Sequence, residues 1–325
     1  MGYDFHVGPE GPRLIEINTN AGGALLNGLH TASICNPERL ACVCRELLPV
    51  DAMEERLFAT FAAELEAASP GAALARAAIA DDRPGAQPLR AEFALFRELF
   101  ERRGVRASVR DVAELERVPG GLAAGGERLD LVYLRDTDWL LEAPRSRALR
   151  EAYLADEVCV TPSPREHHLL AHKARLALFS RPAALEALGA APSDAALLAS
   201  LVPETKLLDE LGFEAAWSTR RDWFFKPGAA FGSRAVYRGD KISRRKLEEI
   251  AATGGFVAQR RVDPGRTAVQ TDAGLREMKF DVRAYAYRDE VLLLGARAYE
   301  GQVTNLRTPG GGFSAICVVR APEGG

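Results

Sequence analysis

Apolar and polar positions near the amino terminus predict a β-hairpin. The runs GYDFHV and RLIEINT read as two strands, and the segment GPEGP between them is rich in the turn formers glycine and proline. From about residue 41 to 68 the apolar residues recur at helical spacing. This second stretch therefore predicts a helix, in which Pro49 is the expected break.

Predicted strands and helices alternate from about residue 72 to 180. The strands are ARAAIADD, VRASVRD, RLDLVYLR and VCVTPSP. The helices are PLRAEFALFRELFERRG, SRALREAYLADE and REHHLLAHKARLALFS. This order predicts a Rossmann-like parallel sheet. The first strand is not followed by G-x-G-x-x-G, so the pattern lends no support to dinucleotide binding.

A third region begins near LVPETKLL and consists mostly of predicted strands with glycine-rich turns. Within it, Lys226 stands at the end of the strand DWFFKP and just before the small residues of PGAAFGS. A lysine in this position can reach phosphates while backbone N–H groups of the loop close over them; the alternative is an ordinary surface lysine. The order G-x-x-x-x-G-K-[ST] is absent, which excludes a P-loop NTPase.

Composition and charge narrow the class of protein. The 325 residues are 47% apolar and 27% charged, with a net charge of −3, which is typical of a globular protein and argues against a broad surface for nucleic acid or an anionic membrane. No apolar run approaches the roughly 18 residues of a membrane span, and MGYDFHV lacks the features of a signal peptide, so we expect a cytoplasmic protein. The cysteines are odd in number, which fits a reducing compartment (Cys35, Cys42, Cys44, Cys159 and Cys317).

Glu16 and Asn18 are candidate ligands of a metal ion. They are two residues apart on the predicted strand RLIEINT, so their side chains leave the same face. A carboxylate beside an amide suits a hard cation such as Mg²⁺, which takes few protein ligands and completes its shell with water and phosphate oxygens. The alternative is a solvated face of the hairpin.

Two further groups of residues have metal-ligand chemistry but weaker patterns. His168 and His172 stand at i and i+4 on a predicted helix, yet no third ligand lies nearby in the sequence, which favours a partly buried or surface pair. Cys42 and Cys44 form a C-x-C pair, together with Cys35, but a helix would point these two thiols apart. Structural cysteines are therefore the favoured interpretation.

The segment RDTDW ends one strand of the predicted parallel sheet. Open α/β sheets bind ligands at the carboxyl ends of their strands. Arg135 and Thr137 are therefore candidates to contact an acid or acceptor substrate, with a structural loop as the equal alternative.

Five segments together resemble the nucleotide and metal apparatus of the ATP-grasp superfamily, and of bacterial glutathione synthetase in particular. They are FFKP with its following GS, FVAQRRV, FDVR, RAYEGQVTNLRTPGGG and LIEINTN. In that family the lysine strand comes first, and the strands with the metal-binding Asp and with E-x-N come last. Here those last two come first, so the chain resembles a circularly permuted ATP-grasp protein. The resemblance covers about residues 1 to 30 and 160 to 320.

The resemblance implies an α/β (α+β) fold with a circularly permuted ATP-grasp core and an inserted Rossmann-like, pre-ATP-grasp domain. The implied regions begin with a metal-binding hairpin (1–30), a helical connector (31–70) and the Rossmann-like domain (71–180). A lid subdomain with the phosphate lysine and adenine hinge follows (181–262), and the remainder of the core ends the chain (263–325).

The resemblance also implies where ATP and metal bind. Asp4, Glu16 and Asn18 would hold one or two Mg²⁺ ions, or Mn²⁺ in their place. Lys226 would bind phosphate. The remaining nucleotide contacts would come from the closing loop, the adenine hinge and the D-x-R strand (Gly232, Ser233, Gln259, Arg261 and Asp281).

The catalytic residues implied by the resemblance are Arg283, Arg297 and Asn305. Arg283 completes D-x-R with Asp281; the alternative is a plain ion pair between two residues on one strand face. Arg297 and Asn305 would face the γ-phosphate and an acyl phosphate. A second phosphate lysine has no convincing counterpart, because Lys206 and Lys173 both stand in unsuitable positions; the equivalent segment carries Arg220 and Arg221 instead.

The implied activity is that of an ADP-forming ligase, dependent on ATP and Mg²⁺, that joins a carboxylate to an amine or a thiol through an acyl phosphate. Small-molecule or peptide carboxylates and amines would be its partners, without nucleic acid or membrane. The alternatives are a small-molecule kinase of the ATP-grasp type and an ATP-binding protein without catalysis.

The start of the chain is unusual for this family, in which a helix normally precedes the strand of the metal-binding Asp. Asp4 follows Met1 by only three residues. We therefore expect an amino-terminally shortened version of a longer protein with a helical upstream segment, since an uncovered sheet face favours association or aggregation. The alternatives are that the 41 to 68 region covers this face, or that a second subunit does so in a homodimer.

Overall fold

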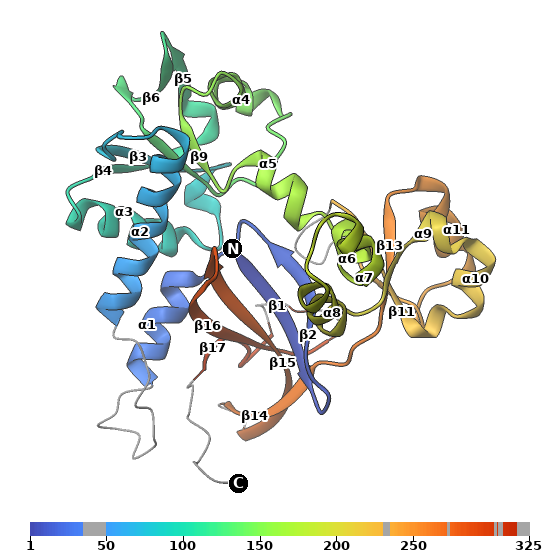
Figure 1. Cartoon of the computed structure of the whole chain (residues 1–325). Helices are drawn as coiled ribbons and strands as arrows, with labels where there is room; N and C mark the ends of the chain where they lie inside the picture. Colours follow the sequence, from blue (N-terminus) through green and yellow to red (C-terminus); the bar gives the residue numbers. More distant parts are fainter. Residues whose placement is uncertain (35–49, 230–234, 272–273, 302–303, 305–307, 317–325) are drawn as a thin grey trace.

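The computed structural model describes residues 1–34, 50–229, 235–271, 274–301, 304 and 308–316 (Figure 1). Across these ranges the strands form four sheets, which helices connect and cover. No helix in the same ranges combines the length and the apolar character needed to cross a membrane.

The largest sheet joins residues from the two ends of the described chain. Its strand order is β17-β16-β15-β1-β2, with β14 paired to β15, and the pairings are antiparallel. The predicted hairpin is confirmed, and it lies beside the carboxyl-terminal strands (Figure 1). The strands are β1 (Gly2–Gly8), β2 (Gly11–Asn18), β14 (Gly265–Thr271), β15 (Gly274–Tyr287), β16 (Glu290–Tyr299) and β17 (Gly312–Ala315).

A second, parallel sheet has the strand order β4-β3-β8-β9. Its strands and helices match those predicted from the alternating pattern: β3 (Arg76–Asp81), α3 (Arg90–Arg102), β4 (Arg106–Asp111), β8 (Leu131–Leu134), α4 (Arg147–Leu154) and β9 (Cys159–Thr161). Short 3₁₀ turns and a small antiparallel sheet that the pattern did not predict complete this region: η1 (Pro84–Ala86), η2 (Val112–Glu114), β5 (Leu115–Val118), β6 (Gly121–Ala124), β7 (Glu127–Arg128) and η3 (Pro144–Ser146).

A third sheet carries Lys226 and has the order β10-β13-β11-β12. Trp223 and Phe225 are buried in a cluster with the neighbouring helices, and alternation along the strand turns Lys226 to the opposite face. The elements are β10 (Thr205–Leu207), α9 (Leu208–Leu211), α10 (Phe213–Ser218), η5 (Arg220–Asp222), β11 (Trp223–Pro227), β12 (Tyr237–Arg238), α11 (Arg244–Thr253) and β13 (Phe256–Arg260).

The prediction of one continuous helix over REHHLLAHKARLALFS is wrong. The segment divides into α5 (Pro164–Glu166), the π-helix η4 (His167–Ala171) and α6 (Ala174–Phe179). His172 has an extended backbone, with φ −65° and ψ 122°, and the next N–H, that of Lys173, donates to the carbonyl of Gly228 at 2.9 Å. A tertiary hydrogen bond thus replaces the helical one. Two further helices follow, α7 (Pro182–Ala187) and α8 (Pro192–Leu201).

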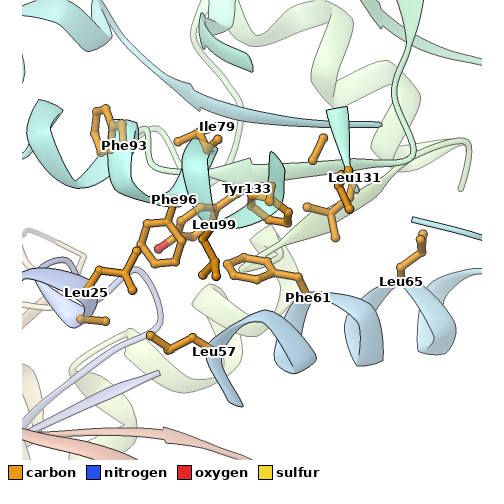
Figure 2. Close-up of a cluster of buried hydrophobic side chains, with 14 of the residues drawn as sticks. Leu25, Leu57, Phe61, Leu65, Ile79, Phe93, Phe96, Leu99, Leu131 and Tyr133 are labelled. Atoms are coloured by element: carbon orange, nitrogen blue, oxygen red, sulfur yellow. The ribbon is translucent and has the colours of Figure 1, made fainter. Parts of the chain in front are cut away.

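The main hydrophobic core lies where two amino-terminal helices, α1 (Ala24–Ile34) and α2 (Val50–Ala68), meet the parallel sheet and α3. Figure 2 shows Phe61, Phe96 and Tyr133 turned toward one another, and the ring of Tyr133 lies 4.9 Å from each of the two phenylalanine rings. Burying each ring contributes about 2 kcal/mol. The same core includes Tyr285 and Leu292, so it joins the parallel sheet to the largest sheet.

Helices also cover the amino-terminal hairpin. Leu14 and Ile17 are buried against Leu176 of α6 and against Val202, which directly follows α8. α2 confirms a helix within the predicted 41 to 68 stretch, whereas Pro49, Cys35, Cys42 and Cys44 lie outside the described residues. The expectation of a helical segment upstream of Met1 stays a prediction.

Candidate acyl-transfer site

Asp4 is the centre of a buried cluster of charges on the largest sheet. Its side chain is 1% exposed, and its two oxygens accept from Arg283 at 2.5 and 2.7 Å. Oδ2 also accepts from Arg297 at 2.9 Å and from the Asn18 amide at 3.1 Å. Strand register explains the arrangement, since Asp4 stands opposite Arg283 on β15 and opposite Glu16 on β2.

Asp281 holds the second arginine from the other side. Its Oδ1 accepts from Nε of Arg297 at 2.7 Å, and its Oδ2 accepts from the hydroxyl of Thr304. Asp281 and Arg297 are register partners on β15 and β16. Arg297 on β16 is therefore fixed by two carboxylates, Asp281 on the neighbouring strand β15 and Asp4 on β1, the strand after it.

The charges in this cluster stabilise one another strongly. Burial raises the pKa of Asp4, but the guanidinium groups of Arg283 and Arg297 outweigh burial and hold the pKa at about 2. Burial likewise lowers the pKa of Arg283, and Asp4 raises it by more. The ion pairs are thus maintained at every physiological pH, and both guanidinium groups are kept in fixed positions.

Two lysines lie beside this cluster, Lys173, which is buried, and Lys226, which is partly exposed. Nζ of Lys173 pairs with Oε1 of Glu16 at 2.8 Å. Nζ of Lys226 donates to Oε1 of Gln259 at 2.6 Å and to the carbonyl of Ile15 at 3.3 Å. Burial, opposed by Glu16 and assisted by nearby Lys173, lowers the pKa of Lys226 to about 8.

Lys173 reaches the site because the helix breaks in front of it. The π-helix η4 ends at Ala171, and the backbone then pairs with the loop that follows β11. That close approach requires glycine at position 228, because an added Cβ would lie 2.5 Å from the ring of His172. Lys173, whose position in the sequence is not convincing for a phosphate lysine, is the site residue that the family resemblance did not assign.

The other candidates for a second phosphate lysine lie apart from this site. Lys206 pairs with Glu204 and is 38% exposed. The guanidinium of Arg220 lies 3.9 Å from the ring of Trp217. Neither contact points to a ligand.

The structure brings together most residues that the family resemblance implied. Arg261 lies outside the cluster, where its side chain pairs with Asp263 at 2.8 Å and its N–H donates to Asp222. Gly232, Ser233 and Asn305 lie outside the described residues. The residues that do meet come from both ends of the chain: Asp4, Glu16, Asn18, Lys226, Gln259, Asp281, Arg283 and Arg297.

The remaining candidates have structural contacts. Nδ1 of His172 accepts from the N–H of Ala174 at 3.3 Å, and its ring lies 6.4 Å from that of His168. Arg135 is buried and donates to Asn20 and to the hydroxyl of Tyr133, so it ties the end of β8 to the loop after β2. Thr137 is exposed in the segment that follows β8.

Glu16 and Asn18 both have side-chain oxygens, which are the donor atoms that a hard cation prefers. The Asn18 amide gives its N–H to Asp4, which leaves its oxygen as the donor atom for a metal. Both oxygens of Asp4 accept from arginine. In the described ranges, no three or more His, Cys, Asp and Glu side chains lie close enough together to hold a metal ion by themselves. A bound Mg²⁺ would therefore take most of its ligands from water and phosphate, and the metal assignment stays a prediction.

Comparison with known proteins identifies the fold. A glutathione synthetase-like effector from Globodera pallida, in its apo form, superposes with a TM-score of 0.56 at 12% identity, over 92% of this chain and 67% of that one. A candidate gamma-glutamylcysteine synthetase from Methylobacillus flagellatus KT superposes with a TM-score of 0.57 at 11% identity, over 93% of this chain and 76% of that one. The chain has the glutathione-synthetase-like fold.

The glutathione-synthetase-like fold confirms the family resemblance at the level of architecture. No protein-family model matches the sequence, and no curated protein matches it. At 12% and 11% identity the two structures share the fold with this chain and do not define its reaction. The circular permutation and the inserted domain stay predictions.

Proposed function

We propose that this chain is an ATP- and Mg²⁺-dependent ligase that joins a carboxylate to an amine or thiol through an acyl phosphate. One observation carries the proposal: Lys173, paired with Glu16, and Lys226, bonded to the carbonyl of neighbouring Ile15, lie beside two arginines that carboxylates hold in place. The similarity to a glutathione synthetase-like effector and to a candidate gamma-glutamylcysteine synthetase supports it.

The charge balance of the site favours an anionic ligand. Within the described part of the chain, four basic side chains face three acidic ones (Lys173, Lys226, Arg283 and Arg297; Asp4, Glu16 and Asp281). A buried excess of positive charge is costly until an anion binds. Phosphate oxygens of ATP would supply that anion, with Lys173 and Lys226 as point charges and Glu16 as the group that positions Lys173.

Arg283 and Arg297 are arranged for the phosphorylated intermediate. A planar guanidinium gives parallel hydrogen bonds to phosphate or carboxylate oxygens, and donors that are already fixed cost no reorganisation during reaction. In the proposed reaction the substrate carboxylate attacks the γ-phosphorus of ATP and ADP leaves. A neutral amine then attacks the acyl carbon, phosphate leaves, and the new amide nitrogen loses a proton.

Glu16 and Asn18 are the residues that would hold Mg²⁺ in this proposal, with Asp4 as the further predicted ligand. The ion would neutralise charge on the phosphate oxygens. Glu16 would then serve both Lys173 and the metal. The place of this hairpin in the sheet, beside the D-x-R strand, supports a circularly permuted ATP-grasp core.

Calorimetric titration with ATP tests the nucleotide site. We expect Lys226→Ala and Lys173→Ala each to weaken binding by at least about tenfold, or 1.4 kcal/mol, because each removes a charge-assisted phosphate contact. Lys206→Ala is the matched control, since this exposed lysine lies on β10 of the same sheet as Lys226. Equal affinities in all four proteins would overturn the proposal.

The reaction class needs a second measurement. ADP release should require both an acid and an amine (or thiol), and mass spectrometry should identify the condensed product. Release with a hydroxyl compound alone would favour the kinase, and ATP binding without turnover across acids and amines would favour a non-catalytic protein.

A further inference from the structure

A cavity of about 340 Å³ lies apart from the lysines, between α2, the end of β15 and the parallel sheet. None of the residues assigned above to nucleotide or metal lines it. Ligand sites in proteins are commonly of this size, mostly apolar, with a few convergent polar groups. Its size and lining are therefore those of a candidate binding site.

The greater part of the wall is apolar. Phe61, Phe96 and Tyr133 form one side, with Tyr133 edge-on to both phenylalanines (Figure 2). Leu57 of α2 and Leu292 of β16 continue this surface. Such a wall suits a planar or branched hydrocarbon body.

Two carboxylates, Glu64 and Glu166, line the polar side together with two cationic groups, the Met1 amine and Arg288. Oε1 of Glu64 accepts from the hydroxyl of Tyr287 at 2.8 Å, and Oε2 of Glu166 accepts from the N–H of Ser163 at 3.1 Å. Among the described residues, neither carboxylate has a lysine or arginine within ion-pair distance. Arg288 also lines the cavity, but its guanidinium lies over the ring of Tyr287 at 5.2 Å.

The negative charges of Glu64 and Glu166 raise the pKa values of neighbouring groups. Burial raises the pKa of Glu64, and Glu166 raises it further. Burial raises the pKa of the Cys159 thiol to about 12, and both carboxylates add to that effect. The Met1 amine, which also lines the cavity, donates to the carbonyl of Ala286 at 2.6 Å; burial lowers its pKa, and Glu166 and Glu64 act in the opposite direction. A cation of suitable size in the cavity would relieve this repulsion.

The cavity adjoins the arginine cluster. Tyr285, which lines it, donates to the carbonyl of Gly22 at 2.8 Å, and Arg283 donates to the same carbonyl at 3.4 Å. Thr19, another lining residue, follows Asn18 directly. A ligand in the cavity would thus lie next to the groups assigned to the acyl phosphate.

We propose that this cavity binds the amine substrate, a primary amine on an apolar body, with its ammonium group at Glu64 and Glu166 and its body against Phe61, Phe96 and Tyr133. The assignment rests on the proposed ligase function for the role of the amine, whereas binding itself does not require ATP.

Calorimetric titration with three small probes in the absence of ATP tests the proposal. Phenethylamine carries both features, 2-phenylethanol has the ring without the charge, and ethylamine has the charge without the ring. We expect phenethylamine to bind at least about tenfold more tightly than either of the others, because only it uses both walls.

Two variants locate the binding. Glu64→Gln and Glu166→Gln keep an oxygen that can accept from Tyr287 and Ser163 respectively, so both should fold. Each should weaken phenethylamine at least about tenfold, while 2-phenylethanol and ATP bind as in the parent. Glu66→Gln, on the exposed face of the same helix, is the matched control and should change nothing.

These titrations distinguish a failure of the amine-site proposal from a failure of the proposed ligase function. Phenethylamine that fails to bind, or that binds equally to parent and both cavity variants, overturns the cavity assignment even when ATP binding depends on Lys226. Phenethylamine binding that depends on Glu64 supports the cavity as an amine site, and if ATP then fails to bind, only the ligase function is overturned.

Discussion

Arg283 and Asp4 form a two-point ion pair, at 2.5 and 2.7 Å, between residues 279 positions apart in the chain. The pair joins β15 to the amino-terminal hairpin, so the sheet that carries the site is completed only when the two ends of the chain meet. Because the same carboxylate also holds Arg297, stability and the geometry of the arginines depend on one side chain.

Asp4→Asn should destabilise the fold by about 3 to 5 kcal/mol, since it leaves Arg283 and Arg297 buried without their shared counter-charge. Urea denaturation of parent and variant measures this difference. Glu277→Gln is the control, because it breaks an exposed pair with Arg266 that contributes at most about 1 kcal/mol. If both variants lost the same free energy of unfolding, the buried ion pair would contribute no more to stability than the exposed one.

Acid should remove the stability that Asp4 contributes. Its folded pKa of about 2 lies below the ordinary value of 3.8, so the contribution is fully present above pH 3.8 and is lost as the pH falls through 2. The shift corresponds to about 2 kcal/mol. The difference in unfolding free energy between parent and Asp4→Asn should therefore shrink over this window, and a constant difference would contradict the assignment.

Glu16→Gln should abolish ADP release and leave the fold intact. The amide can still accept from Lys173, whereas the loss of one anionic ligand weakens the predicted Mg²⁺ site. Thermal unfolding and an ADP-release assay test the two halves of this prediction. Glu10→Gln, in the turn of the same hairpin, should leave both unchanged. Near-normal turnover in Glu16→Gln would remove this residue from the metal site.

ATP affinity should fall as the pH rises through 8. Burial holds the pKa of Lys226 at about 8, so the free lysine loses its charge above that value while the phosphates of ATP are already fully ionised. We expect a loss of up to about tenfold per pH unit in the parent, and little pH dependence in Lys226→Arg, whose guanidinium stays charged. Calorimetric titrations with ATP between pH 7 and 9 measure the affinity of both proteins. The same pH dependence in the parent and in Lys226→Arg would contradict the prediction.

Much of the secondary structure follows from local patterns. Turn residues and alternation predicted the hairpin of β1 and β2, and apolar periodicity predicted the strands and helices of the parallel sheet. The lysine at the end of β11 was also visible, because a strand ending in Lys-Pro before small residues is a local signal. The turn between β5 and β6 was missed, since two four-residue strands leave too short a pattern.

Lys173 shows where local patterns fail. Apolar spacing runs unbroken through REHHLLAHKARLALFS, and nothing within that segment marks the break at His172. The break depends on a carbonyl of Gly228, 55 residues further along the chain, which accepts the N–H of Lys173. A hydrogen bond between distant segments thus decided the position of a buried cation.

The sequence by itself determined which strands carry acidic, basic and amide side chains, because alternation and turn chemistry act within a few residues. Only the tertiary structure decided which of those side chains meet. The pairing of β1 with β15 placed Asp4 between two arginines, and the packing of α2 against distant strands enclosed the cavity beside Glu64. Strand register and helix packing arise from contacts between remote segments, which no local pattern specifies.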